Sequence, residues 1–182
     1  PILTFINKLD RDVRNPIDLL DEVEDILKIE CAPIYWPLGM GKEFKGIYNL
    51  STDTLFVYDH DHADAVNEVK TIDGLDSDEA AELLGSYVDD FRDEIELVRG
   101  ASHDFNCQSY LEGKQTPVFF GTALGNFGVE QILNDFVEWA PAPQNRVATS
   151  REVDAKDKNF SGFIFKIQAN MDPRHRDRVA FM

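Results

Sequence analysis

The sequence predicts an α/β fold, and two similar stretches of the chain indicate it. The apolar runs Pro1–Ile6 and Thr116–Gly121 are each followed by a polar loop, and then by apolar residues at helical spacing. A repeated order of strand, loop and helix is typical of open α/β sheets, whose ligands bind at the carboxyl ends of the strands. Between the two runs, short strand-like segments and a long amphipathic helix predict an inserted α+β subdomain.

The first predicted strand is Pro1–Ile6, whose continuous apolar character is that of a strand covered on both faces. Because a mature chain rarely begins on such a strand, we expect further sequence before it. A helix is predicted to start at Asn15-Pro16, since an asparagine cap followed by proline at the first helical position is a common helix start. Its apolar residues recur at helical spacing at Ile17, Leu20, Val23 and Leu27.

The insertion is predicted from the elements that follow. A strand is expected over Ala32–Leu38, and glycines mark turns after it. Strand-like runs then occur at Gly46–Leu50, Thr54–Tyr58 and Ala65–Ile72. One long helix is predicted from Asp78 to Arg99, with an apolar stripe of Ala80, Leu84, Tyr87, Phe91, Ile95 and Val98. With a shorter helix over Asp104–Glu112, these elements place the insertion at about 44–113.

The last part of the chain predicts a domain boundary. After the strand Thr116–Gly121, a helix carrying Val129, Ile132, Leu133, Phe136 and Val137 is expected to end at Ala140-Pro141-Ala142-Pro143. The polar stretch 144–158 is predicted to be a linker. Phe160–Ala169 and Val179–Met182 are predicted as two strands of a separate β structure. We therefore expect a first domain over 1–143, a linker over 144–158 and a second domain from 159 to 182.

Composition excludes several classes of protein. The chain has 34 acidic and 18 basic residues, a net charge of -16, and phosphate binding needs a basic surface, so we expect no DNA partner. It has no run of about 18 apolar residues and no signal-peptide pattern, which predicts a cytoplasmic protein without a membrane partner. Cys31 and Cys107 lack any C-x-x-C spacing, so both are predicted to be reduced, buried thiols.

The sharpest local motif is Asn7-Lys8-Leu9-Asp10, directly after the first strand. N-K-x-D in this position is the guanine-reading motif of GTPases. Guanine presents two donors on one edge, N1–H and N2–H, and the Asp10 carboxylate could accept both, whereas adenine offers no such pair. Asn7 could bind N7 of the base and tie two loops together, while the Lys8 stem could lie along the purine face. A polar loop with helix-capping roles would show the same four residues, so this alternative stays open.

A second loop, Thr122-Ala123-Leu124, follows the later strand and matches the S/T-A-x guanine motif of the same fold. In this motif the backbone N–H of Ala123 would meet the guanine O6, and a small residue lets the backbone approach the base. An ordinary strand-to-helix turn is the alternative. The two motifs together, in this order and each after an apolar strand, are more specific than either alone.

Five stretches of the chain resemble the peptide chain release factor 3 family of bacterial translational GTPases. They are Phe5–Asp12, Ala32–Pro37, Thr116–Val129, Glu138–Pro143 and Gly162–Pro173. The last stretch separates this family from the similar elongation factor G. The resemblance covers nearly the whole chain and is weakest over about 52–78.

The resemblance implies a fold and an activity. The fold would be the C-terminal part of a P-loop GTPase domain with an inserted subdomain, followed by the first strands of a β-barrel domain. The full-length protein would be a ribosome-dependent GTPase that binds GTP or GDP with Mg²⁺ and recycles class I release factors during translation termination. Its partners would be the ribosome and those factors, with contact to ribosomal RNA through the second domain.

One departure from the family pattern is important. The phosphate loop G-x-x-x-x-G-K-[ST], the switch threonine and D-x-x-G do not occur in these 182 residues. Those parts hold the phosphates and Mg²⁺ and position the attacking water. The fragment is therefore expected to contain neither Mg²⁺ ligands nor catalytic residues and to be inactive alone.

Other charged and aromatic groups are given structural roles or left open. Asp59-His60-Asp61-His62 has metal-like spacing but is interpreted as a solvated loop, so no metal site is assigned. The basic cluster Arg174–Arg178 is either a phosphate contact or a solvated turn. Trp36 and Trp139 are expected in the core, and the acids Asp89, Asp90, Asp93, Glu94 and Glu96 on a solvated helix face. The alternative function is a non-catalytic module that binds a ribosomal or protein partner through the insertion.

Overall fold

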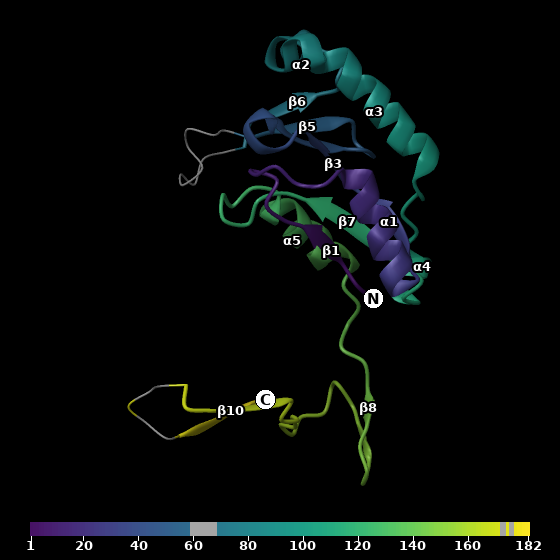
Figure 1. The fold of residues 1–182 in the computed structure, drawn as a ribbon. Coiled ribbons are helices and arrows are strands. Elements are labelled where there is room, and N and C mark those ends of the chain that lie inside the picture. Colours follow the sequence, from purple (N-terminus) through teal and green to yellow (C-terminus); the bar gives the residue numbers. More distant parts are fainter. Residues whose placement is uncertain (59–68, 172–173, 175–176) are drawn as a thin grey trace. The chain divides into compact units, whose positions relative to one another are not determined.

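The computed structural model describes residues 1–58, 69–171, 174 and 177–182, and it has a mixed α/β fold (Figure 1). The chain separates into two compact units, unit 1 over Pro1–Ala140 and unit 2 over Pro141–Met182. The boundary falls within the Ala-Pro-Ala-Pro sequence.

Unit 1 contains a three-stranded parallel sheet in the order β1-β7-β2, formed by β1 (Thr4–Ile6), β2 (Glu30–Pro33) and β7 (Gln115–Phe120). All residues of the central strand β7 are buried, whereas those of β1 are half-buried. The first strand is therefore less completely buried than its continuous apolar character predicted. β1 pairs with β7 along one edge and has no strand on its other edge among the described residues.

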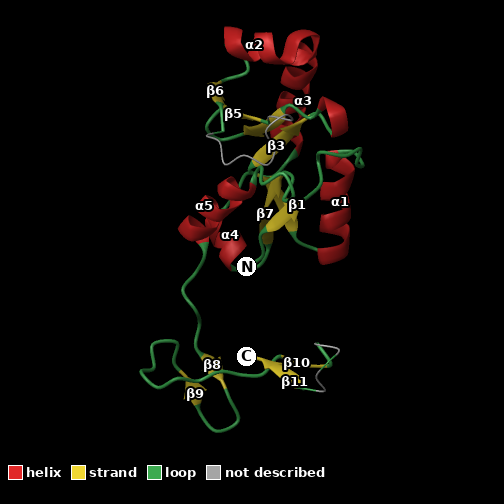
Figure 2. Cartoon of the chain, turned by 90° about the vertical axis from the view of Figure 1, so that its left-hand side faces the viewer, coloured by secondary structure: helices red, strands yellow, loops and turns green. Residues whose placement is uncertain are grey.

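Helices α1 (Pro16–Leu27) and α5 (Val129–Trp139) lie on opposite sides of this sheet (Figure 2). The predicted start of α1 is confirmed, because the Asn15 side chain accepts the N–H of Ile17 at 2.9 Å and Pro16 is the first helical residue. The helix ends at Lys28, whose φ of 56° is left-handed and stops further helical bonds.

A four-stranded antiparallel sheet follows, in the order β3-β4-β5-β6. Its strands are β3 (Tyr35–Leu38), β4 (Gly46–Asn49), β5 (Thr54–Val57) and β6 (Thr71–Asp73), with a 3-10 turn η1 (Gly41–Glu43) between the first two. Of the predicted strand Ala65–Ile72, residues 65–68 lie outside the described ranges.

The predicted single strand Ala32–Leu38 is divided between the two sheets at Ile34. The N–H of Ile34 donates to Val118 O at 3.0 Å in the parallel sheet, and its C=O accepts the N–H of Leu50 at 3.0 Å from the antiparallel sheet. One residue thus joins the two sheets. The inserted sheet begins at Tyr35, before the expected start at about 44.

The predicted long helix is interrupted. It comprises α2 (Asp78–Leu84), a 3-10 turn η2 (Gly85–Tyr87) and α3 (Val88–Ala101). Gly85 has a φ of 56°, which an α-helix cannot contain, so the helix stops and restarts there. The change of direction leaves Tyr87 49% exposed, although the helical pattern placed it on the apolar stripe.

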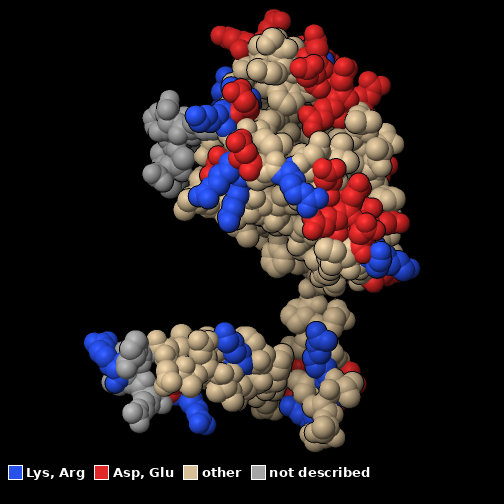
Figure 3. Space-filling model, viewed as in Figure 1, with Lys and Arg blue, Asp and Glu red and all other residues tan. Residues whose placement is uncertain are grey.

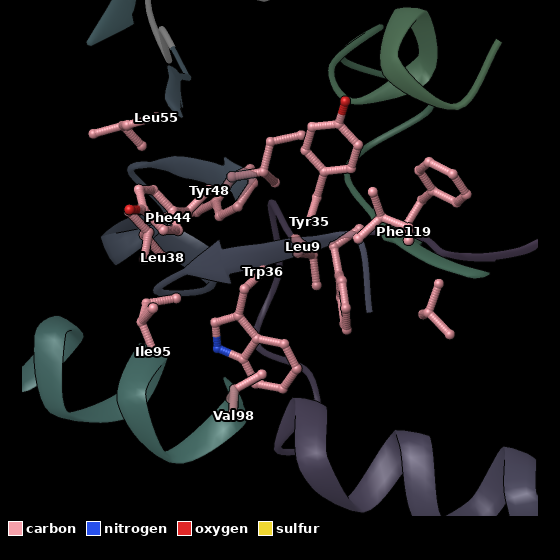
Figure 4. Packing of buried hydrophobic residues seen from close by; sticks show 14 of the residues in the cluster. Leu9, Tyr35, Trp36, Leu38, Phe44, Tyr48, Leu55, Ile95, Val98 and Phe119 are labelled. Atoms are coloured by element: carbon pink, nitrogen blue, oxygen red, sulfur yellow. The ribbon is translucent and has the colours of Figure 1, made fainter. Parts of the chain in front are cut away.

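The insertion packs against the rest of unit 1 at Trp36, which is fully buried (Figure 4) and whose ring centroid is 5.3 Å from that of Phe120 in β7. Its indole points toward Ile95 and Val98 of α3, and its Nε1–H donates to Glu94 Oε1 at 3.0 Å. Burial raises the pKa of Glu94 above its ordinary value. The expectation that Glu94 belongs to a solvated acidic face is therefore wrong, whereas Trp36 is a core residue as predicted.

The connection back to the parallel sheet runs through α4 (Cys107–Leu111), whose cap is the side chain of Asn106. Both cysteines are free, but only Cys31 is buried, so the expectation of two buried thiols is wrong for the exposed Cys107. Trp139 at the end of α5 is partly buried and stacks against Phe105 with 4.3 Å between ring centroids.

The described strands of unit 2 form two short hairpins. The first pairs β8 (Arg146–Val147) with β9 (Glu152–Val153), within the stretch expected to be a linker. The second pairs β10 (Lys166–Ala169) with β11 (Arg178–Phe181). Most apolar side chains in this hairpin and just before it are exposed, including Phe163 at 75% and Phe165 at 65%.

Candidate functional site

The two sequence motifs lie side by side at the carboxyl ends of neighbouring strands in the parallel sheet. β1 and β7 are parallel neighbours with Ile6 opposite Phe120, so the loops that follow them leave the sheet at the same end. Backbone hydrogen bonds continue past the strands: the N–H of Gly121 donates to Ile6 O at 3.1 Å, and that of Leu9 donates to Gly121 O at 3.2 Å. Residues separated by more than a hundred positions thus form one surface.

The side chain of Asn7 joins the two loops. Its Oδ1 accepts the N–H of Lys8 at 2.7 Å and the N–H of Ala123, in the other loop, at 2.9 Å. The expected tie between loops is therefore present. The same hydrogen bond occupies the Ala123 N–H, which was expected to donate to the guanine O6. The next N–H, that of Leu124, has no hydrogen-bond partner within the described ranges, and the Leu124 side chain is 84% exposed.

Leu9 anchors the first loop. Its side chain is fully buried, and its C=O accepts the N–H of Gly41 at 2.8 Å from the start of the insertion. Lys8 on one side is exposed and Asp10 on the other is partly exposed. Burial of the variable residue of N-K-x-D thus presents the two charged residues toward solvent.

Asp10 is available to accept hydrogen bonds. Its side chain is 28% exposed, and its nearest cation is Arg11, with 3.9 Å between Nε and Oδ2. That ion pair is loose and exposed on the arginine side, so it competes weakly with another donor. In the described part of the chain, no N–H or O–H donates to the Asp10 carboxylate.

The second loop is a tight turn closed by its own backbone. Thr122 and Phe127 exchange both N–H···O bonds at 3.0 Å, and the Thr122 hydroxyl accepts the N–H of Gly125 at 3.3 Å. Thr122 is buried, which leaves Ala123 and Leu124 as the exposed members of the motif. A Cβ at Gly121 would lie 2.3 Å from the Phe127 carbonyl oxygen, so no larger residue fits there.

Two of the remaining candidates include residues outside the described ranges. Asp59-His60-Asp61-His62 lies outside the described residues, as do four of the residues in 172–176. Among residues that the structure describes, no cluster of three potential metal ligands occurs. None of the helices in the described ranges combines the length and apolarity needed to cross a membrane.

Comparison with known proteins identifies no family for this chain, since no family model matches it. A crystal structure of a protein from Thermus thermophilus is similar over 78% of this chain and 22% of that one, with 21% sequence identity and a TM-score of 0.46. The chain therefore spans about a fifth of the length of that protein.

Proposed function

We propose that this chain supplies guanine recognition in a GTP-binding translation termination factor of the release factor 3 type. The whole protein would use GTP hydrolysis on the ribosome to release class I release factors. The observation that carries the proposal is the 2.9 Å hydrogen bond from the Ala123 N–H to Asn7 Oδ1, which joins the N-K-x-D and T-A-L loops at adjacent strand ends. A chance occurrence of two unrelated loops would not predict this contact.

The exposed groups of the site match the edge of guanine. The Asp10 carboxylate would accept N1–H and N2–H, and each charge-assisted bond would be stronger than a neutral one. The Lys8 stem would cover one face of the purine. The Leu124 N–H would donate to O6, and Thr122 closes the turn that holds this donor.

Phosphate and magnesium binding would come from elsewhere in the protein. The free edge of β1 is consistent with this, because in such a domain the strands that carry the phosphate loop would continue the sheet there. Mg²⁺ would be held by residues outside this chain. Since phosphates and Mg²⁺ provide most of the affinity for a nucleotide, the chain alone would bind guanine nucleotides only weakly, with a Kd of about 1 mM or higher.

The base preference of the chain tests the guanine site directly. Amide chemical shifts of the 182-residue chain would be followed by NMR during titration with GMP, AMP and xanthosine monophosphate. We expect shifts with GMP at Lys8, Asp10 and Leu124 and none with AMP. Asp10→Asn should invert the preference between GMP and xanthosine monophosphate, since the amide can donate to the xanthine O2 while still accepting N1–H.

The size of the effect and a control make this test decisive. Hydrogen bonds to a charged group contribute about 1.5–3 kcal/mol, so the ratio of the two affinities should change by about tenfold or more. Asp12→Asn, which changes a carboxylate next to the motif, should leave the ratio unchanged. Equal responses of the wild-type chain to GMP and AMP would refute guanine recognition.

The termination role rests on the resemblance and needs a separate measurement. A longer protein that contains these residues and a phosphate loop should hydrolyse GTP faster in the presence of ribosomes. With Asp10→Asn it should prefer xanthosine triphosphate. GTP hydrolysis that ribosomes do not stimulate would retain the guanine site and exclude the translational role.

A second candidate function is a module that binds a ribosomal or protein partner through the insertion. One observation favours it: acidic side chains gather over α2 and α3 (Figure 3), where Asp93 and Glu96 flank an open groove with Leu97, Gly100 and Ala101. Leu97, which lines this groove, is 58% exposed. If the chain co-sediments with purified ribosomes and Leu97→Asp prevents this, while GMP does not bind, the second function is correct.

A further inference from the structure

The inserted sheet and the second loop of the site share an aromatic cluster, formed by Phe44, Tyr58 and Phe127. The ring centroids of Phe44 and Tyr58 are 5.1 Å apart, those of Tyr58 and Phe127 are 5.1 Å apart, and those of Phe44 and Phe127 are 5.8 Å apart. Phe44 and Phe127 are buried, and Tyr58, which follows β5, is half-buried between the insertion and the loop. These separations are within the range of stabilising aromatic pairs.

Phe127 determines the shape of the loop that this cluster contacts. Its backbone exchanges both hydrogen bonds with Thr122, which closes the turn containing Ala123 and Leu124. A displacement of Phe127 would therefore move the backbone that presents the Leu124 N–H. Tyr58 also lies close to the turn itself, because a Cβ at Gly125 would stand 3.0 Å from the Tyr58 hydroxyl oxygen.

The insertion also contacts the first loop of the site. The N–H of Gly41 donates to the carbonyl of Leu9 at 2.8 Å, between Lys8 and Asp10. A Cβ at Gly41, where φ is 58°, would lie 2.4 Å from the Asp12 Oδ1. Both loops of the site thus rest on residues of the insertion, although the motifs themselves lie outside it.

We propose that Tyr58 is a positioning residue for the guanine site, because it holds Phe127 and so directs the Leu124 N–H toward the base. This proposal rests on the proposed function. The side chain of Tyr58 would not contact the base edge that Asp10 reads. Loss of its ring should therefore weaken binding of the base without changing which base is preferred.

The test compares Tyr58→Ala with two further variants in the complete chain. GMP and AMP titrations followed by NMR should show roughly three- to tenfold weaker GMP binding in Tyr58→Ala, because the unbound loop is no longer held in its binding shape. The preference for GMP over AMP should remain. Tyr58→Phe keeps the ring and should restore binding. Ile72→Ala removes a buried side chain from the same sheet and should lower stability without changing GMP affinity.

A second measurement needs no ligand. The amide protons of Thr122 and Phe127 should exchange with solvent faster in Tyr58→Ala than in the wild-type chain, and at the wild-type rate in Ile72→Ala after correction for global stability. Unchanged exchange at both amides would overturn the proposal, as would equal losses of GMP affinity in Tyr58→Ala and Ile72→Ala. If the wild-type chain does not bind GMP, the proposed function fails, and amide exchange alone then decides whether Tyr58 positions the loop.

Discussion

Lys8 has a φ of 72°, a backbone conformation that residues with a Cβ rarely adopt. Its surroundings account for this: Asn7 Oδ1 accepts the Lys8 N–H at 2.7 Å, and the next residue, Leu9, is fully buried. The conformation turns the chain sharply enough for Leu9 to enter the core while Lys8 and Asp10 stay outside. Strain of about 1–3 kcal/mol at one residue is retained where the neighbours determine the backbone, and such residues concentrate at functional sites.

A second residue, Asp135 on α5, also has an unfavourable setting. Its Oδ2 is buried without a hydrogen-bond partner among the described residues. Burial, with a smaller contribution from Glu138, raises the pKa of Asp135 to about 6 from an ordinary value of 3.8. A raised pKa in the folded state means that this carboxyl favours folding when protonated, fully below about pH 3.8, and that this contribution is lost as pH rises through about 6.

Asp135→Asn should therefore raise the melting temperature at pH 7.5 and change it little at pH 4. Asp53→Asn is the matched control, because the pKa of Asp53 is shifted in the opposite direction, below its ordinary value. Hydrogen bonds from Arg99 and Tyr48 lower the pKa of Asp53, so its contribution is present above its ordinary pKa of 3.8 and should be lost in the variant at both pH 5 and pH 7.5. Melting curves of the three chains between pH 4 and 8 measure this. A difference between Asp135→Asn and wild type that does not depend on pH would contradict it.

At the scale of elements, the sequence predicted the bounds of a helix or strand well where residues close in the sequence determine them. The Asn15-Pro16 start of α1 is an example, because the cap and the N–H that it accepts are two residues apart. The division of Ala32–Leu38 at Ile34 was not predictable, since it depends on Val118 and Leu50 pairing with one residue from different sheets. The same holds for Ala123: sequence predicted its N–H as a donor but not that Asn7 accepts it.

Gly85 could have indicated the break between α2 and α3. The prediction of one continuous helix followed the apolar periodicity instead. The effect of this glycine can be measured by substitution. Gly85→Ala should destabilise unit 1 by about 1 kcal/mol, because φ is 56° there and a Cβ disfavours that conformation, even though nothing lies within 4 Å of the added atom.

Gly100 provides the control, because it lies in α3 with equally open space around its Cβ. Gly100→Ala should stabilise by about 0.5–1 kcal/mol, since alanine is the better helix former. Urea unfolding of both variants measures whether each substitution raises or lowers the free energy of unfolding. If Gly85→Ala also stabilises the chain, α2 and α3 form one continuous helix in solution.

For the whole molecule, charge and burial are distributed very unequally between the two units. Unit 1 has 29 acidic and 10 basic residues, a net charge of -19, whereas unit 2 has 5 acidic and 8 basic residues, a net charge of +3. The hydrophobic core cluster lies entirely within unit 1. No described residue of unit 2 is buried, so the two units cannot contribute equally to stability.

This difference predicts that a chain ending at Ala140 keeps the stability of the complete chain. Two short hairpins without a covered apolar face are marginal in water, so unit 2 should exchange its amides rapidly and contribute no cooperative transition. The truncated chain should melt within about 2 °C of the complete chain, because the contacts that unfold cooperatively are retained. It should also be more soluble, having lost exposed side chains such as Phe160, Phe163 and Phe165.

A chain ending at Gly128 is the control. It lacks α5, including Ile132 and Trp139, which pack on the core, and it should melt at a much lower temperature. Calorimetry of the three chains checks this, and a melting temperature for the Ala140 chain well below that of the complete chain would mean that unit 2 covers part of unit 1 in solution.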